Sequence, residues 1–150
     1  MILENLKQLT SLMSGKQREY YDALVASSHV IECEKMAAVL PEKIYQRIIA
    51  GVVPIQKKEC FKNATLVSLT FPDVKYVEGQ FECCGIPIDH AWNEYNGHYF
   101  DVTREVVLKD DISGEYVAFT ECESSELLDI LMECRYYGDV FRTKFLKSKK

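Results

Sequence analysis

Three residues of the types used in nucleophilic catalysis stand far apart in the chain: Cys60, His90 and Asp101. A cysteine attacks as a thiolate, and it needs a base within hydrogen-bond reach that a third group orients. Histidine and aspartate can fill these two roles. The three residues therefore predict acyl transfer through a thioester. Cys60 would attack an amide or ester carbonyl, and His90 would protonate the leaving group and then activate water or an acceptor amine. No cofactor is expected.

The residues around Cys60 predict a helix. From 59 to 71 the pattern is apolar nearly all round, which is typical of a helix buried in the middle of a domain. Cys60 would stand at its start, where free backbone amides and the positive end of the helix dipole favour a thiolate. Lys57 and Lys58 would act in the same direction.

The dipeptide Asn96–Gly97 lies between two aromatic-rich runs and predicts a β-hairpin with a two-residue loop. In that register Trp92 faces Asp101, and alternate residues of one strand share its face. His90 and Asp101 are then diagonal neighbours with Cβ atoms about 7 Å apart, a gap that an imidazole and a carboxylate can close. A three-residue loop would turn Asp101 to the opposite face, so the predicted triad depends on the two-residue loop.

Two polar residues near Cys60 are candidates to support it. The backbone amide of Cys60 and the side chain of Gln56 could together form an oxyanion hole. Asn63 follows Cys60 by three residues and shares its helix face. It would either bridge the helix to the sheet or satisfy backbone groups as a buried amide.

Three more candidates lie on the predicted strands. Glu78 would be an acceptor close to the triad or an outward-facing charge, and the second interpretation is favoured. Gly79 would let the nucleophile helix or a substrate approach closely. Trp92 would shield the ion pair from water or belong to the core. His29 and His98 are expected at the surface.

The first half of the chain reads as helical and the second half as mainly β. Apolar spacing predicts helices over 3–13, 16–27, 31–40, 41–51 and 59–71, and another that starts at 124. Strands are predicted over 75–83, 90–95, 98–103 and 116–120.

Helices followed by an antiparallel meander indicate an α+β fold. We expect N-terminal helices and a buried nucleophile helix packed on a small antiparallel sheet. Residues 1–150 would form a single domain. It would consist of a helical part (1–51), a catalytic-like core (52–120) and a C-terminal helix with a basic tail (121–150).

Composition and charge limit the partners and the cellular location that we expect. The 150 residues carry 18 Lys and Arg against 23 Asp and Glu, a net charge of −5, which argues against nucleic-acid binding. The basic tail 144–150 is expected to be solvated. No apolar run approaches the roughly 20 residues needed to cross a bilayer, and the charged start is not a signal peptide. We therefore expect a cytoplasmic protein with no membrane or nucleic-acid partner.

The six cysteines are expected to be mostly reduced and buried, as small apolar side chains. Cys83 and Cys84 are adjacent and no CxxC motif occurs, so the spacing does not suit a tetrahedral zinc site. A zinc protein that uses Cys83, Cys84, His90 or His98 is the weakest alternative, and no metal is expected.

Four short stretches together resemble the transglutaminase-like branch of the papain-like cysteine enzymes. They are Glu-Cys-Phe-Lys-Asn-Ala at 59–64, Tyr-Val-Glu-Gly at 76–79, His-Ala-Trp-Asn at 90–93 and Phe-Asp-Val-Thr at 100–103. More narrowly, the chain looks like small bacterial and bacteriophage proteins built on that core. The resemblance covers about residues 59 to 103, and it implies that Cys60 is the nucleophile, His90 the base and later acid, and Asp101 the residue that orients His90.

The resemblance implies a cysteine peptidase, an amidase or deamidase, or a cross-linking transferase, with a protein or peptide as substrate. The alternative is a non-catalytic protein-binding module on the same fold, for example a phage factor that binds a host protein. Aromatic residues expected at the surface, such as Tyr136 and Tyr137, would suit that role.

Overall fold

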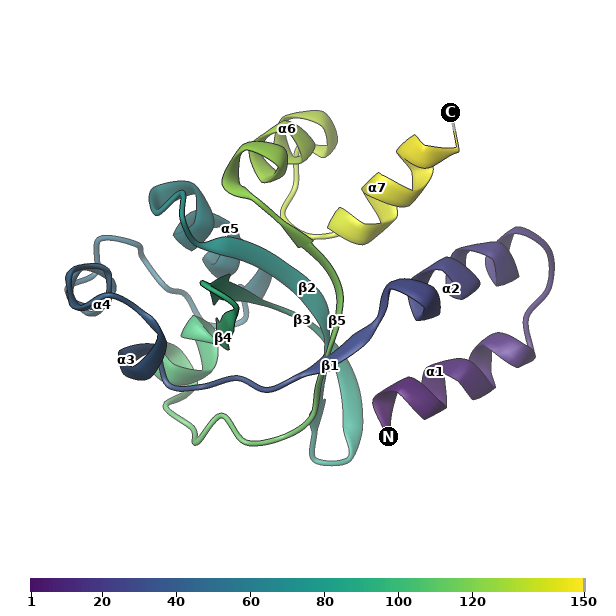
Figure 1. Ribbon diagram of the computed structural model, residues 1–150, viewed down its shortest axis with the longest axis horizontal. Coiled ribbons are helices and arrows are strands. Elements are labelled where there is room, and N and C mark those ends of the chain that lie inside the picture. Colours follow the sequence, from purple (N-terminus) through teal and green to yellow (C-terminus); the bar gives the residue numbers. More distant parts are fainter. Residues whose placement is uncertain (150) are drawn as a thin grey trace.

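A computed structural model describes residues 1–149 and has an α+β fold (Figure 1). Its centre is a five-stranded antiparallel sheet, curled into a half-barrel, with the strand order β1-β5-β2-β3-β4. The strands are β1 (His29–Ile31), β2 (Lys75–Cys83), β3 (Ile86–Tyr95), β4 (His98–Phe100) and β5 (Tyr116–Cys122). This agrees with the fold class that the sequence predicts.

Helices surround the sheet on several sides. The first four are α1 (Ile2–Ser11), α2 (Gly15–Ser27), α3 (Met36–Val39) and α4 (Glu42–Ile49). They are followed by α5 (Cys60–Thr70), the π-helix η1 (Thr103–Leu108), α6 (Ser124–Cys134) and α7 (Val140–Ser148). Figure 1 shows α1 and α2 side by side at one end of the molecule, with α3 and α4 at the other.

Helix α5 is buried, as its sequence predicts. Its inward positions include Ala64 and Val67, both with no exposed surface. Ala64 packs in one apolar cluster with Tyr76 of β2 and Ala91 of β3, whereas Val67 packs in another with Phe100 of β4. The helix is therefore held on two sides, which explains why its sequence is apolar nearly all round.

The β3–β4 hairpin has the predicted two-residue loop. Tyr95 pairs with His98, and both loop residues have positive φ, +52° at Asn96 and +85° at Gly97. A tight two-residue turn of this kind needs left-handed backbone at both positions, which Asn and Gly adopt at little cost. Strand β4 ends at Phe100 rather than at residue 103, so Asp101 directly follows the sheet.

The prediction of one helix over 31–40 is wrong. Residues 29–31 instead form β1, which pairs with β5 and buries Ile31 beside Tyr116. The β-branched side chains of Val30 and Ile31 suit a strand, and pairing with β5 decides the outcome. Only Met36–Val39 are helical, and Pro41 disfavours helical backbone at Leu40.

The prediction of a solvated basic tail over 144–150 fits the exposed residues 146–149 but not Lys144. Residues up to Ser148 belong to α7, and Val140 at its start is buried. The Lys144 ammonium donates to the Thr120 hydroxyl and to the Glu121 carbonyl, both at 2.9 Å, so this lysine ties α7 to β5. Lys150 lies outside the described residues.

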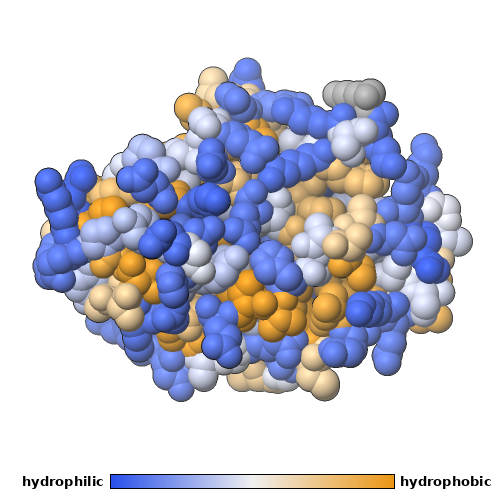
Figure 2. Space-filling view, viewed as in Figure 1, coloured by the Kyte–Doolittle hydropathy of each residue, from blue (hydrophilic) through white to orange (hydrophobic). Residues whose placement is uncertain are grey.

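Hydrophilic side chains cover most of the face shown in Figure 2, and apolar side chains form patches between them. Across residues 1–149, the helices all fall short of the length and apolar character that crossing a bilayer requires.

Candidate active site

The β3–β4 hairpin brings His90 and Asp101 into direct contact. His90 lies on β3, and its Nε2 is 2.7 Å from Oδ2 of Asp101. His90 is 4% exposed and Asp101 is not exposed at all, so the pair is shielded from water. The predicted diagonal arrangement across the hairpin is present.

Cys60 occupies the first position of α5, as predicted, and is half-buried. Helix α5 packs against β3. Strand β4 pairs with β3 only at Asn93–Tyr95, so the pairing does not extend to His90. Hydrogen bonding with the Cys60 thiol is among the interactions that raise the pKa of His90. Cys60 therefore lies near enough to the His90–Asp101 pair to affect the pKa of His90.

The charge state of His90 follows from its surroundings. Burial lowers the pKa of His90, but the Asp101 charge and hydrogen bond, and then the Cys60 thiol, outweigh it and raise this pKa to about 9. The imidazolium is therefore favoured at neutral pH. An imidazolium beside a cysteine at a helix N-terminus is a setting that stabilises a thiolate.

Asp101 is held by two further donors that the sequence analysis missed. The Tyr116 hydroxyl donates to Oδ2 at 2.7 Å, and the Arg104 backbone N–H donates to Oδ1 at 3.2 Å. Together with His90 these give the buried carboxylate three hydrogen-bond partners, as a buried charge requires. In the sequence, residue 116 only begins a predicted strand, and nothing in the irregular stretch before it indicates which residues Arg104 will meet.

Asn63 joins the start of α5 to its surroundings. Its Oδ1 accepts from the Gln56 backbone N–H at 2.9 Å, and its Nδ2 donates to the Gln56 carbonyl at 2.8 Å and to the Thr103 hydroxyl at 3.0 Å. Both predicted roles are therefore combined: the amide satisfies backbone groups and bridges α5 to the segment after Asp101.

The structure gives no support for Gln56 as an oxyanion donor. The side chain is exposed, and its oxygen accepts a hydrogen bond from Lys62 at 3.3 Å. The sequence spacing placed Gln56 near Cys60, but it is the backbone of this residue that Asn63 fixes. The backbone amide of Cys60 stays as the oxyanion donor that the sequence proposes.

Glu78 is buried, at 8% exposure, so the favoured interpretation as an outward-facing charge is wrong. Its carboxylate accepts from the Tyr76 hydroxyl at 2.7 Å and from the backbone N–H groups of Val140 and Phe141, both at 3.1 Å. Burial raises the pKa of Glu78, and these hydrogen bonds oppose the rise. The interpretation failed because both faces of β2 are covered, and the alternation of residues along a strand does not show this. Glu78 caps α7 and makes no contact with the triad through these bonds.

Gly79 is a close-approach site, but for β5 and Trp92 rather than for the helix or a substrate. A Cβ at this position would lie 1.9 Å from the Val117 carbonyl oxygen and 2.9 Å from the Trp92 ring. Trp92 is fully buried and stacks on His90 at 6.1 Å between centroids. It therefore belongs to the core and also shields the ion pair, which combines the two predicted interpretations.

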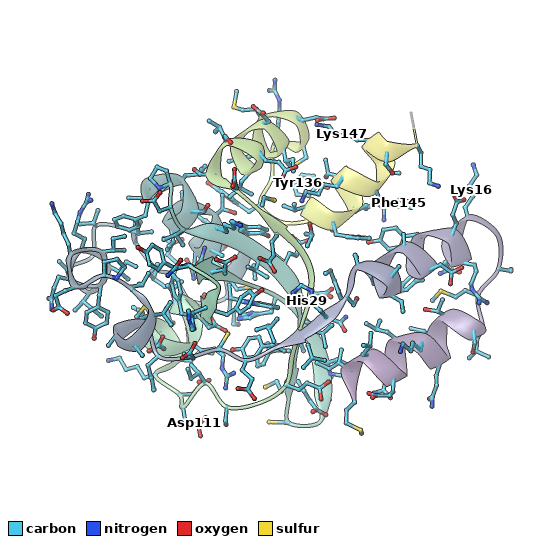
Figure 3. The ribbon with its side chains drawn as sticks, in the orientation of Figure 1. Lys16, His29, Asp111, Tyr136, Phe145 and Lys147 are labelled. Carbon is cyan, nitrogen blue, oxygen red and sulfur yellow. The ribbon has the colours of Figure 1, made fainter. Side chains whose placement is uncertain are left out.

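The other predicted surface residues lie where expected. His29 on β1 (labelled in Figure 3) is exposed and contacts Glu121, and His98 on β4 is exposed and contacts Glu34. Tyr136, in the connection between α6 and α7, is 51% exposed. The hydrogen bonds of these three side chains go to residues other than Cys60, His90 and Asp101.

The cysteines and acidic residues do not assemble a metal site in the described part of the chain. Across residues 1–149, no three His, Cys, Asp or Glu side chains come close enough together to hold an ion. Cys83 and Cys84 are exposed where β2 turns into β3, and all six cysteines are free thiols.

Comparisons of the chain with protein-family models, with curated proteins and with solved structures gave no match. The chemistry of the site is therefore the basis for a function, because a fold by itself does not define one.

Proposed function

We propose that this protein is a thiol-dependent acyl-transfer enzyme that uses Cys60, His90 and Asp101 as a catalytic triad. It would resemble the transglutaminase-like branch of the papain-like cysteine enzymes. The observation that supports this most directly is the buried 2.7 Å contact between His90 and Asp101, together with the Cys60 thiol among the groups that raise the pKa of His90. A nucleophile, a base and an orienting carboxylate from three separate segments have no need to meet in a purely structural core.

The reaction would proceed in two halves. The Cys60 thiolate attacks a carbonyl carbon, the bond to the leaving amine or alcohol breaks, and a thioester forms while His90 gives its proton to the leaving group. His90 then takes a proton from water or from an acceptor amine, which attacks the thioester and releases Cys60. Asp101 stabilises the imidazolium in both halves. The Cys60 backbone amide at the start of α5 stabilises the oxyanion.

The substrate class would be an amide or ester in a protein or peptide, which makes the protein a peptidase, an amidase or deamidase, or a transferase. The reaction requires a reduced thiol, and all six cysteines are free. A reducing compartment fits this requirement, so we place the protein in the cytoplasm.

The test is the rate of alkylation of each cysteine by iodoacetamide, followed by mass spectrometry between pH 5 and 8. Cys60 should react fastest although it is half-buried, and the exposed Cys83 and Cys84 serve as internal controls. An Asp101→Asn variant should slow Cys60 by about tenfold or more and leave the controls unchanged, because the imidazolium loses its partner. Alkylation of Cys60 no faster than that of Cys83 and Cys84 would contradict the proposal.

A non-catalytic protein-binding module is the second candidate, because apolar side chains stay exposed along α6 and after it. Leu128, Met132, Tyr136 and Tyr137 are 46%, 69%, 51% and 39% exposed. Such a module, for example a phage factor that binds a host protein, would retain the same partner in wild type and in Cys60→Ala. An enzyme would retain its substrate measurably only in Cys60→Ala, so pull-down with both forms separates the two.

A further inference from the structure

A continuous chain of hydrogen bonds runs from a buried cation to the candidate catalytic base. Nη1 of Arg104 donates to the Tyr116 hydroxyl oxygen at 2.8 Å, and the Tyr116 hydroxyl donates to Oδ2 of Asp101 at 2.7 Å. The same oxygen of Asp101 is 2.7 Å from Nε2 of His90. All four residues are buried, with exposures between 0% and 6%.

Arg104 determines which group donates and which accepts in each of these hydrogen bonds. A guanidinium has donors and no acceptor, so the Tyr116 oxygen must accept from it. Tyr116 has a single proton, which is therefore the one given to Asp101. The carboxylate accepts, and Nε2 of His90 must carry a hydrogen to complete the bond. Nδ1 is then the ring nitrogen left to exchange a proton with the Cys60 thiol.

We propose that Arg104 and Tyr116 are positioning residues, which orient Asp101 and keep His90 in the form that offers Nδ1 to Cys60. This inference rests on the proposed function, because it gives the two residues a role in the reaction of Cys60. Neither residue touches the reacting atoms in this arrangement. They act through Asp101.

Arg104 is itself held in place by other partners. Its Nε donates to Asp110 at 2.9 Å and its Nη2 donates to the Ser113 carbonyl at 2.9 Å. The guanidinium also lies over the Phe81 ring, 4.9 Å from the centroid. With these contacts made, Nη1 is the nitrogen directed at Tyr116, so the chain begins from a fixed point.

Both residues keep their protons. Burial lowers the pKa of Arg104, but the hydrogen bonds to Asp110 and Tyr116 outweigh it and raise the pKa above its ordinary value. Burial, and then the Asp101 charge, raise the pKa of the Tyr116 hydroxyl well above its usual range. Tyr116 therefore stays a donor to Asp101 at every pH at which the enzyme would work.

The effect on His90 has a definite sign. The titratable and charged groups around its ring are Asp101 from the segment after β4, the Cys60 thiol of α5, and Tyr116 of β5 with Arg104 behind it. Tyr116 and Arg104 stabilise the Asp101 carboxylate even when His90 is neutral, so they compete with the imidazolium for it. Loss of the Tyr116 hydroxyl would make the carboxylate depend more on the imidazolium and raise the pKa of His90 further.

The experiment is an NMR titration of the histidine side-chain nitrogens in the full chain, wild type against Tyr116→Phe. The chain has only three histidines, and the exposed His29 and His98 are internal references. In wild type, neutral His90 should show hydrogen on Nε2. In Tyr116→Phe its titration should move up by about one pH unit, since a hydrogen bond to a charged group is worth roughly that much. A Tyr99→Phe variant removes a similar bond, 2.6 Å to Glu121, and should leave His90 unmoved. His98 alone is the reference in this variant, because the Tyr99 hydroxyl and Glu121 also contact His29.

Two results would overturn the inference: an unchanged His90 titration in a folded Tyr116→Phe protein, or hydrogen on Nδ1 rather than on Nε2 in neutral wild-type His90. If Tyr116→Phe does not fold, Arg104→Lys provides the same readout with the charge retained and the planar fork lost. The titration does not require Cys60 to react. Slow alkylation of Cys60 would therefore count against the proposed function, and an unmoved His90 titration against the positioning role.

Discussion

Asn63 shows how one buried side chain can place a reactive residue on another turn of the same helix. Its side-chain hydrogen bonds do not reach the triad, yet its amide holds the Gln56 backbone on one side and the Thr103 hydroxyl on the other. Gln56 lies in the segment that leads into Cys60, and Thr103 lies two residues after Asp101. Asn63 thus fixes the two segments that carry the nucleophile and the carboxylate relative to each other.

Replacing Asn63 with Ala should lower the free energy of unfolding by about 1–3 kcal/mol, because three hydrogen bonds are lost and the Thr103 hydroxyl is left buried. Urea denaturation measures this change. Gln46→Ala is the matched control, since it removes an amide whose one side-chain bond, to Glu42, is exposed. The control should change stability by less than about 0.5 kcal/mol. Equal effects of the two substitutions would show that Asn63 is not a structural tie.

The sequence predicts the triad residues but not Tyr116 and Arg104, which hold Asp101. The reason is that sequence patterns report on neighbouring residues, not on contacts between distant segments. Asn96–Gly97 sets the register of one hairpin, so it makes His90 and Asp101 diagonal neighbours from local information alone. Tyr116 reaches Asp101 across 15 residues of irregular chain and π-helix. No period of 2 or 3.6 runs through that segment, so its partners are decided only by the packed structure.

The N-terminal end of helix α7 is capped by a single carboxylate in the sheet. Glu78 of β2 accepts from the backbone N–H groups of Val140 and Phe141, which have no partner within the helix itself. The negative charge also faces the positive end of the helix dipole. The lysine-rich sequence of this region indicates a solvated tail. The sequence does not show that the region is anchored, because the anchoring residue, Glu78, lies 62 residues before Val140.

We expect Glu78→Gln to loosen α7 selectively. The amide keeps one acceptor oxygen and turns an NH₂ group toward backbone donors, so the cost should be about 1–3 kcal/mol. Hydrogen exchange at Val140 and Phe141 should accelerate more than exchange in the centre of β2. Glu133→Gln is the control, because Glu133 also binds α7, through Lys147 at 2.7 Å, but at the exposed surface. If Glu133→Gln accelerates exchange as much as Glu78→Gln, the capping role of Glu78 is wrong.

The stability of the whole molecule should depend on pH through the buried His90–Asp101 pair. The pKa of His90 rises from its usual 6.5 to about 9 in the folded protein. A group whose pKa is higher in the folded state adds stability that is complete below its unfolded pKa and is lost as the pH rises through its folded pKa. The contribution is therefore full below pH 6.5 and disappears above pH 9. A rise of this size corresponds to about 3 kcal/mol.

Urea unfolding at pH 6, 7.5 and 9.5 tests this for wild type and His90→Gln. Wild type should lose about 3 kcal/mol more than the variant across the range, because glutamine does not titrate. The comparison of wild type with His90→Gln also cancels a second cause of lost stability at high pH. Burial raises the pKa of Cys33 and of Cys122, so both thiols also cost stability as the pH rises, but equally in the two proteins. Parallel curves for wild type and His90→Gln would mean that Asp101 does not hold His90 as an imidazolium. The protonation states proposed for the triad would then be wrong.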